Sequence, residues 1–186
     1  MAPRIILWTI ALLLTVTAGV LDWRTRRIPN WLTVTGLLVG ITAHTVIPIW
    51  QGANVWQGAK TSLMGVGLAL ALLLPLVLLR ALGAGDWKLM GAVGAILGPM
   101  LFLFVLLGSI FAAGLMGAVQ AIRTKRVRVT LVNMMVLVQG FATFGFQPNP
   151  EISLNNPGLM KLPFGVGVAA STIGCFVAAH WTHWAR

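Results

Sequence analysis

The chain has 186 residues, of which 58% are hydrophobic and 9% are charged, and its mean hydropathy is +0.91. This composition excludes a water-soluble globular domain with an ordinary charged surface and indicates a membrane protein. Thirteen Lys and Arg against three acidic residues give a net charge of +10. These basic residues stand in short stretches between apolar runs, so they indicate membrane orientation rather than nucleic-acid binding.

Long apolar runs predict five full-length transmembrane helices, over residues 5–21, 31–50, 61–79, 100–122 and 164–184. A further run, 87–97, is about 16 Å long as a helix and is too short to span a bilayer. Gly98 and Pro99 follow it directly, which predicts a short embedded helix that meets the next helix at a corner. The expected fold is all-α: a single polytopic membrane domain, 1–186, with about six transmembrane or membrane-embedded helices.

The distribution of basic residues predicts the orientation of these helices. With the N-terminus outside, ten of the thirteen basic residues fall on the inner face and three on the outer face. The inner residues are Arg24, Arg26, Arg27, Arg80, Lys88, Arg123, Lys125, Arg126, Arg128 and Lys161. An excess of Lys and Arg marks cytoplasmic loops, so we expect this face to lie in the cytoplasm.

The longest connection, at about 123–163, is expected to be a cytoplasmic or interfacial loop. Its start is basic from Arg123 to Arg128, which suits contact with anionic lipid headgroups. Residues 131–146 are apolar but are interrupted by polar residues and glycines, so an interfacial or re-entrant segment is favoured over a seventh span.

Two of the three acidic residues stand at edges of apolar runs. Asp22 closes the first run, Asp86 opens the short one, and Glu151 lies among prolines in the long connection. An ionised carboxylate at the edge of hydrocarbon is costly unless it is paired or hydrated. Two spans separate Asp22 from Asp86, so both face the same compartment whichever way the chain inserts.

Neighbouring residues make a close approach of the two aspartates plausible. Gly83 and Gly85 let the backbone before Asp86 come near another helix. Gly91, Gly94, Ala95 and Gly98 give the short helix a close-packing side. After Asp22, Pro29 restricts Ile28, and Asn30 is suited to cap the next helix, so this loop is short and stiff.

A pair of adjacent carboxylates has the asymmetry that peptide hydrolysis needs. Like-charge repulsion and partial desolvation favour a pair that holds one proton at neutral pH. The ionised member draws a proton from water while the protonated member donates to the carbonyl oxygen. The alternative is structural: Asp22 pairs with Arg26 one helical turn later, and Asp86 caps the short helix.

Residues 22–33 read Asp-Trp-Arg-Thr-Arg-Arg-Ile-Pro-Asn-Trp-Leu-Thr, and residues 83–89 read Gly-Ala-Gly-Asp-Trp-Lys-Leu. Together they resemble the two signatures of type IV prepilin peptidases. Residues 162–167 are similar to a third, weaker motif, with Phe164 where the family usually has tyrosine. The length resembles that of the compact members that serve tight-adherence, or Flp-type, pili.

This resemblance implies an aspartic endopeptidase of the bacterial cytoplasmic membrane that cuts the basic leader from prepilins or pseudopilins at its cytoplasmic end. It assigns catalysis to Asp22 and Asp86. The supporting motif residues are Ile28, Pro29, Asn30, Gly83, Gly85, Lys88, Pro163 and Gly165. Longer members add an N-terminal cysteine-bearing region and methylate the new terminus, so methyl transfer is not expected here.

The sequence leaves the roles of several other residues open. Lys88 is either an interfacial anchor or a charge that steadies an aspartate or contacts substrate. The single cysteine, Cys175, excludes a zinc site built from cysteines. The three histidines, His44, His180 and His183, are not placed to join the aspartates in a metal site. No cofactor or metal is therefore expected. The rival functions are a presenilin-like peptidase that cuts deeper in the membrane and a proton-coupled transporter, although no acid lies at mid-bilayer.

Overall fold

The computed structural model describes residues 2–50, 52, 54–142 and 163–182. In these parts of the chain the regular structure is helical throughout: α1 (Ala2–Thr25), α2 (Asn30–Trp50), α3 (Val55–Leu78), α4 (Ala84–Arg123), α5 (Val127–Ala142) and α6 (Phe164–Thr182). Five of these helices, α1, α2, α3, α4 and α6, are long and apolar enough to cross a membrane. The prediction of an all-α multi-pass membrane protein is confirmed.

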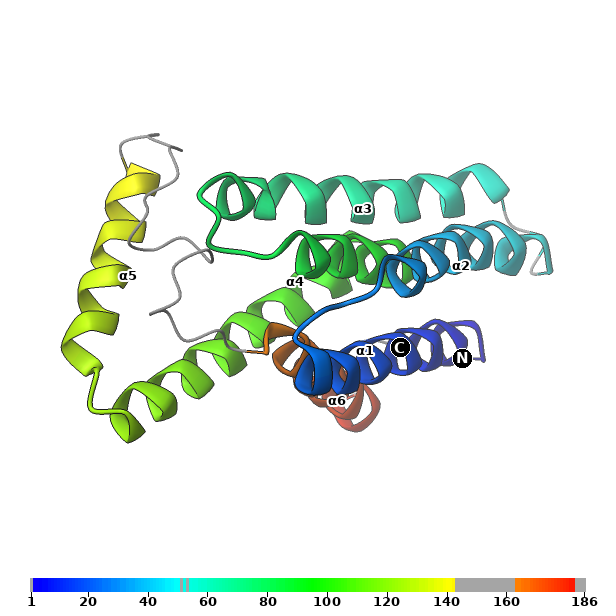
Figure 1. Ribbon diagram of the computed structural model, residues 1–186. Helices are drawn as coiled ribbons and strands as arrows, with labels where there is room; N and C mark the ends of the chain where they lie inside the picture. The colour runs from blue at the N-terminus through cyan, green and yellow to red at the C-terminus, as the bar shows by residue number, and fades with distance from the viewer. Residues whose placement is uncertain (1, 51, 53, 143–162, 183–186) are drawn as a thin grey trace.

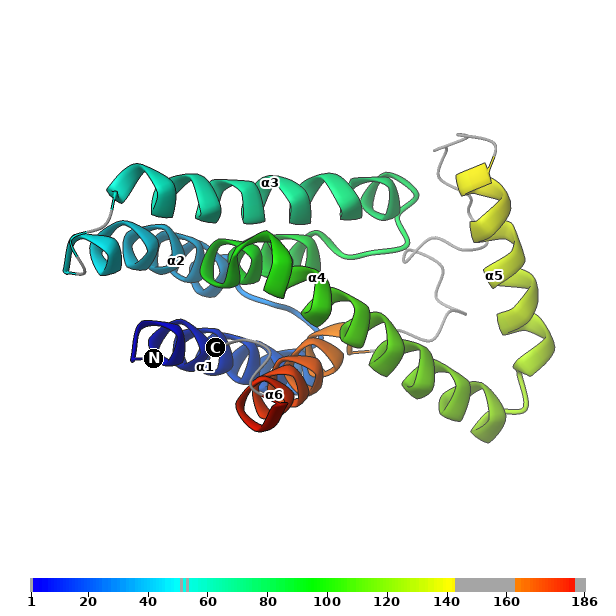
Figure 2. The same cartoon turned by 180° about the vertical axis from the view of Figure 1, so that it is seen from behind.

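The helices α1, α2 and α3 run alongside one another, as Figures 1 and 2 show from opposite sides. The first half of α4 packs against α2 and α3, and its most extensive contacts are with α3. The second half of α4 turns away from α3 and packs with α6, which also lies against α1. Thus α4 joins the two sides of the helical bundle.

Helix α4 has a sharp kink where the corner was predicted. Gly98 has φ 74° and ψ 175°, which no helical residue adopts, and Pro99 follows it. Proline has no N–H, so the carbonyl of Ala95 loses its helical partner. The buried Ser62 hydroxyl of α3 donates to this oxygen at 2.9 Å. The prediction of a short helix that meets its successor at Gly98 and Pro99 is confirmed.

A second side chain completes this arrangement at the kink. His44 Nε2 of α2 lies 3.0 Å from the carbonyl oxygen of Ile96. A carbonyl oxygen only accepts, so this bond requires a proton on Nε2. Inside a membrane, a carbonyl oxygen without a hydrogen-bond donor costs roughly several kcal/mol. Ser62 and His44 supply donors to the carbonyls at the kink, so the break in α4 is tolerated.

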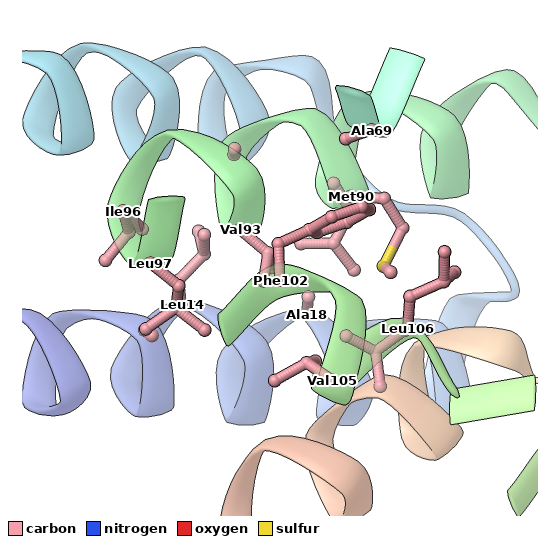
Figure 3. Packing of buried hydrophobic residues seen from close by; sticks show 14 of the residues in the cluster. Leu14, Ala18, Ala69, Met90, Val93, Ile96, Leu97, Phe102, Val105 and Leu106 are labelled. Carbon is pink, nitrogen blue, oxygen red and sulfur yellow. The ribbon is translucent and has the colours of Figure 1, made fainter. Parts of the chain in front are cut away.

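Small residues bring α3 and α4 into backbone contact. A Cβ at Gly65 would overlap the carbonyl oxygen of Gly94, and one at Gly98 would lie 2.8 Å from Thr61 Cγ2. The close-packing side predicted for the short helix is therefore confirmed. Phe102 and Val105 from the second half of α4 belong to the same buried hydrophobic cluster as Met90 of the first half, and Figure 3 shows this cluster between the helices.

Two local features add detail to the expectations from the sequence. Helix α2 begins at Asn30 itself, one residue before the expected start at Trp31. The long connection at about 123–163 contains a regular helix, α5, which stands across the ends of the other helices in Figures 1 and 2. Residues 143–162 of that connection, with Glu151 and Lys161, lie outside the described residues.

Candidate active site

Asp22 lies in the last turn of α1 and is buried, with 7% of its surface exposed. Its Oδ2 accepts a hydrogen bond of 2.9 Å from the backbone N–H of Gly165, in the first turn of α6. The positive end of the α6 dipole and this N–H both favour a carboxylate at this place. Helix α6 therefore provides the polar partner that a buried Asp22 needs.

The alternative role considered for Asp22, a pair with Arg26 one helical turn later, takes a different form from a simple helical pair. The backbone N–H of Arg26 bonds to the Asp22 carbonyl at 2.9 Å, but Arg26 has φ 54° and lies just beyond the end of α1. Its guanidinium still acts electrostatically on the Asp22 carboxylate. Arg26 therefore provides a positive charge near Asp22, in addition to the backbone N–H of Gly165.

Asp86 lies in the first turn of α4, where Gly83 is the N-cap residue with extended backbone angles, φ −70° and ψ 144°. The backbone N–H of Gly83 donates to the Asp86 carboxylate. This is the return bond from the third helical position to the N-cap, as in half of a capping box. The capping role considered for Asp86 is therefore present, and it fixes the carboxylate at the start of α4.

The two carboxylates interact with each other. Asp22, at the end of α1, exerts an electrostatic effect on Asp86, at the start of α4. The intervening α2 and α3 cross the bundle in opposite directions, so the end of α1 and the start of α4 lie at the same end (Figure 1). The structure thus places the two acids at the same end of the bundle, and each carboxylate accepts a backbone N–H from a helix start.

Residues of the two motifs also contact each other directly. Lys88 Nζ donates to Asn30 Oδ1 at 3.0 Å. A Cβ at Gly85 would lie 3.4 Å from Ile28 Cβ, so the first turn of α4 packs on the loop between α1 and α2. Pro29 is partly buried between these two contacts. The five residues link the loop to the helix that carries Asp86.

The third motif lies on the other side of Asp22. Pro163 is buried just before α6, and its carbonyl accepts from Val166 N–H at 3.2 Å, which closes the first turn. A Cβ at Gly165 would lie 3.1 Å from both Cβ and Oδ2 of Asp22. Phe164 packs against the hydrophobic core. The sequence indicated Pro163 and Gly165 as supporting residues, but it did not predict the hydrogen bond from Gly165 to Asp22.

Comparison with families of known proteins gives one result that bears on this site. Residues 8–118 match the model of the type IV leader peptidase family. The chain belongs to the type IV leader peptidase family. As a member of this leader peptidase family, it is a membrane peptidase. The matched region includes Asp22 and Asp86, whereas α6 and its bond to Asp22 lie beyond it. Comparison with curated proteins and with solved structures finds no match.

Two residues of this leader peptidase, Ser62 and His44, stabilise the candidate site without being part of it, and the sequence did not indicate this role. Ser62 and His44 bind the carbonyls at the kink of α4, and so stabilise the short helix whose first turn contains Asp86. The spacing of small buried residues along α3 would have indicated this close contact; they are Gly58, Ser62, Gly65 and Ala69. Across the described residues, no three His, Cys, Asp or Glu side chains form a group able to hold a metal ion.

Proposed function

We propose that this leader peptidase is an aspartic endopeptidase that removes the basic leader from prepilins or pseudopilins of the Flp type. The observation that carries the proposal is that Asp22 and Asp86 lie at the same end of the bundle, where they interact electrostatically and each carboxylate accepts a backbone N–H at the start of a helix. Both residues occupy the aspartate positions of the two motifs that resemble those of prepilin peptidases.

The proposed reaction uses these two carboxylates and one water molecule. The ionised aspartate takes a proton from water, whose oxygen forms a bond to the scissile carbonyl carbon. The protonated aspartate donates its proton to the carbonyl oxygen, which gives a tetrahedral intermediate. The intermediate then collapses: the C–N bond breaks, the nitrogen receives a proton from the protonated aspartate, and the ionised aspartate takes a proton from one hydroxyl of the gem-diol as the C=O bond re-forms. The pair then holds one proton again.

Cleavage is proposed to occur at the cytoplasmic face of the bacterial inner membrane. Asp22 is in the last turn of α1 and Asp86 in the first turn of α4, so both lie at the edges of apolar segments. Exposed basic residues on the same end, Arg24, Arg27 and Lys88, fit a cytoplasmic orientation. The site can therefore reach a bond near the membrane surface, where the leader of a prepilin meets its apolar helix.

The direct test is to replace each aspartate with asparagine. Asp22→Asn and Asp86→Asn keep the size of the side chain and remove its acid-base function, so each is expected to abolish conversion of a co-expressed prepilin on a gel. Glu151→Gln, which removes the third acidic residue, is the matched control and should leave conversion intact. Normal processing by either aspartate variant, at wild-type membrane abundance, would refute the mechanism.

A second experiment separates this function from intramembrane cleavage of general helical substrates. Test substrates carry the scissile bond at increasing depth in their apolar segment. Because both carboxylates lie at helix ends, cleavage is expected to decline as the bond moves away from the membrane surface. Undiminished cleavage deep in the apolar segment would instead favour a presenilin-like function.

A further inference from the structure

We propose that the Lys88–Asn30 hydrogen bond is a positioning clamp, which holds the first turn of α4 against the α1–α2 loop and so sets the separation of Asp22 and Asp86. The inference rests on the proposed function, because it gives Lys88 and Asn30 a role in the same reaction. Neither residue is proposed to touch the reacting atoms. Both act through the two aspartates.

The α4 side of the clamp has two contacts on one face. Gly85 and Lys88 are three residues apart in the first turns of α4, so they lie on the same side of the helix. Gly85 packs against Ile28, with 3.4 Å from an added Cβ to Ile28 Cβ, and Lys88 Nζ reaches Asn30 Oδ1 at 3.0 Å. Asp86 stands between them in the chain, so these contacts define the position of its backbone.

The loop side of the clamp is connected to Asp22 by local bonds. The Thr25 hydroxyl donates to the carbonyl of Leu21 at 2.8 Å and lies 3.0 Å from that of Arg27. Pro29 then fixes the backbone just before Asn30. A short, internally bonded segment therefore connects Asp22 to Asn30, and a displacement of Asn30 is transmitted to the end of α1.

The direction of the Lys88 side chain argues against its two simpler roles. Residues two positions apart on a helix do not face each other, so Lys88 is poorly placed to steady Asp86 directly. An interfacial anchor would extend its ammonium into the headgroups. Instead the ammonium donates to a side chain of the other motif, and a hydrogen bond from a charged donor is stronger than one between neutral groups.

The first test measures geometry without reference to activity. In a Cys175→Ser background, Ile28→Cys and Gly85→Cys place two thiols within disulfide range, because their Cβ atoms are expected to be 3.4 Å apart. Oxidation in isolated membranes should form this disulfide readily. Adding Asn30→Leu or Lys88→Met should slow its formation about fivefold. Equal rates with and without the clamp would overturn the proposal. Lys60→Met, at the far end of α3, is the control.

The second test reads the reaction with a prepilin that the wild-type enzyme cleaves. Asn30→Leu and Lys88→Met should each lower kcat about tenfold with little change in KM, and the double variant should be no worse than either single variant. Asn30→Asp keeps an acceptor oxygen and should restore cleavage. Additive losses, or an effect confined to KM, would show that Lys88 contacts substrate independently. If the wild-type enzyme cleaves no prepilin, the proposed function is refuted. The disulfide test still shows whether the Lys88–Asn30 bond holds α4 against the loop, because it does not depend on activity.

Discussion

The backbone N–H of Gly165 donates to Asp22 Oδ2 across a separation of 143 residues in the chain. The bond joins the last turn of α1 to the first turn of α6, and it places the positive end of a helix dipole beside a buried carboxylate. The last helix therefore contributes to the candidate site through its backbone. This role explains why a glycine, with no side chain to intrude on Asp22, suits this position.

Gly165→Ala is expected to lower cleavage of a prepilin by about 10- to 100-fold, because a displacement of a reacting group by about 1 Å has effects of this size. The added Cβ would lie 3.1 Å from Asp22 Cβ and Oδ2 and would push the carboxylate aside. Gly174→Ala on the same helix meets no atom within 4 Å and is the matched control. Conversion is measured on gels at equal enzyme abundance, and equal activity of the two variants would contradict the predicted displacement.

The rate of cleavage is expected to follow a bell-shaped pH profile. At low pH both carboxylates are protonated and no base is left to activate water. At high pH both are ionised and no acid is left to protonate the carbonyl oxygen. The limbs describe the pair rather than either residue alone. Initial rates between about pH 4 and pH 9, with enzyme stability checked at each pH, test this, and a plateau on either side would contradict a shared proton.

Gly65→Ala is expected to destabilise the protein by about 1–3 kcal/mol, the usual cost of overpacking. A Cβ at this position would overlap the carbonyl oxygen of Gly94, so α3 and α4 would have to separate. Gly67→Ala on the same helix meets nothing within 4 Å and should be neutral or stabilising by up to about 1 kcal/mol. Unfolding of the purified variants in detergent compares the two, and equal stabilities would mean that the helices are less tightly packed.

Ser62→Ala is expected to cost about 1–2 kcal/mol of stability, because it leaves the carbonyl oxygen of Ala95 without its donor at the kink. The exposed Thr42 of α2 donates its hydroxyl proton within its own helix, to the carbonyl of Leu38 at 2.9 Å. Thr42→Ser keeps that bond and serves as the control, with an expected change below about 0.5 kcal/mol. The same unfolding assay applies, and a neutral Ser62→Ala would show that water or another group satisfies Ala95.

Several elements were predictable from the sequence because their signals are local. The apolar runs predicted the ends of α1, α2 and α6 to within about four residues, whereas α3 begins at Val55, six residues before the expected start at 61. The kink at Gly98 followed from a proline that cannot donate and a glycine that tolerates φ 74°. The helix in the long connection, α5, was harder to predict. Its polar residues interrupt the apolar run, so a search for long apolar runs alone does not identify it as a helix.

In the candidate site, too, some features were predictable from the sequence and others were not. Sequence alone determined a multi-pass helical protein and placed Asp22 and Asp86 at one face, because hydropathy sets the number of crossings and their parity follows from it. Only the tertiary structure decided that Gly165 binds Asp22, that Lys88 binds Asn30, and that the two acids interact. These contacts depend on how the helices rotate and tilt against one another. Side-chain packing between segments that are distant in the sequence fixes those angles, and no local sequence pattern records that packing.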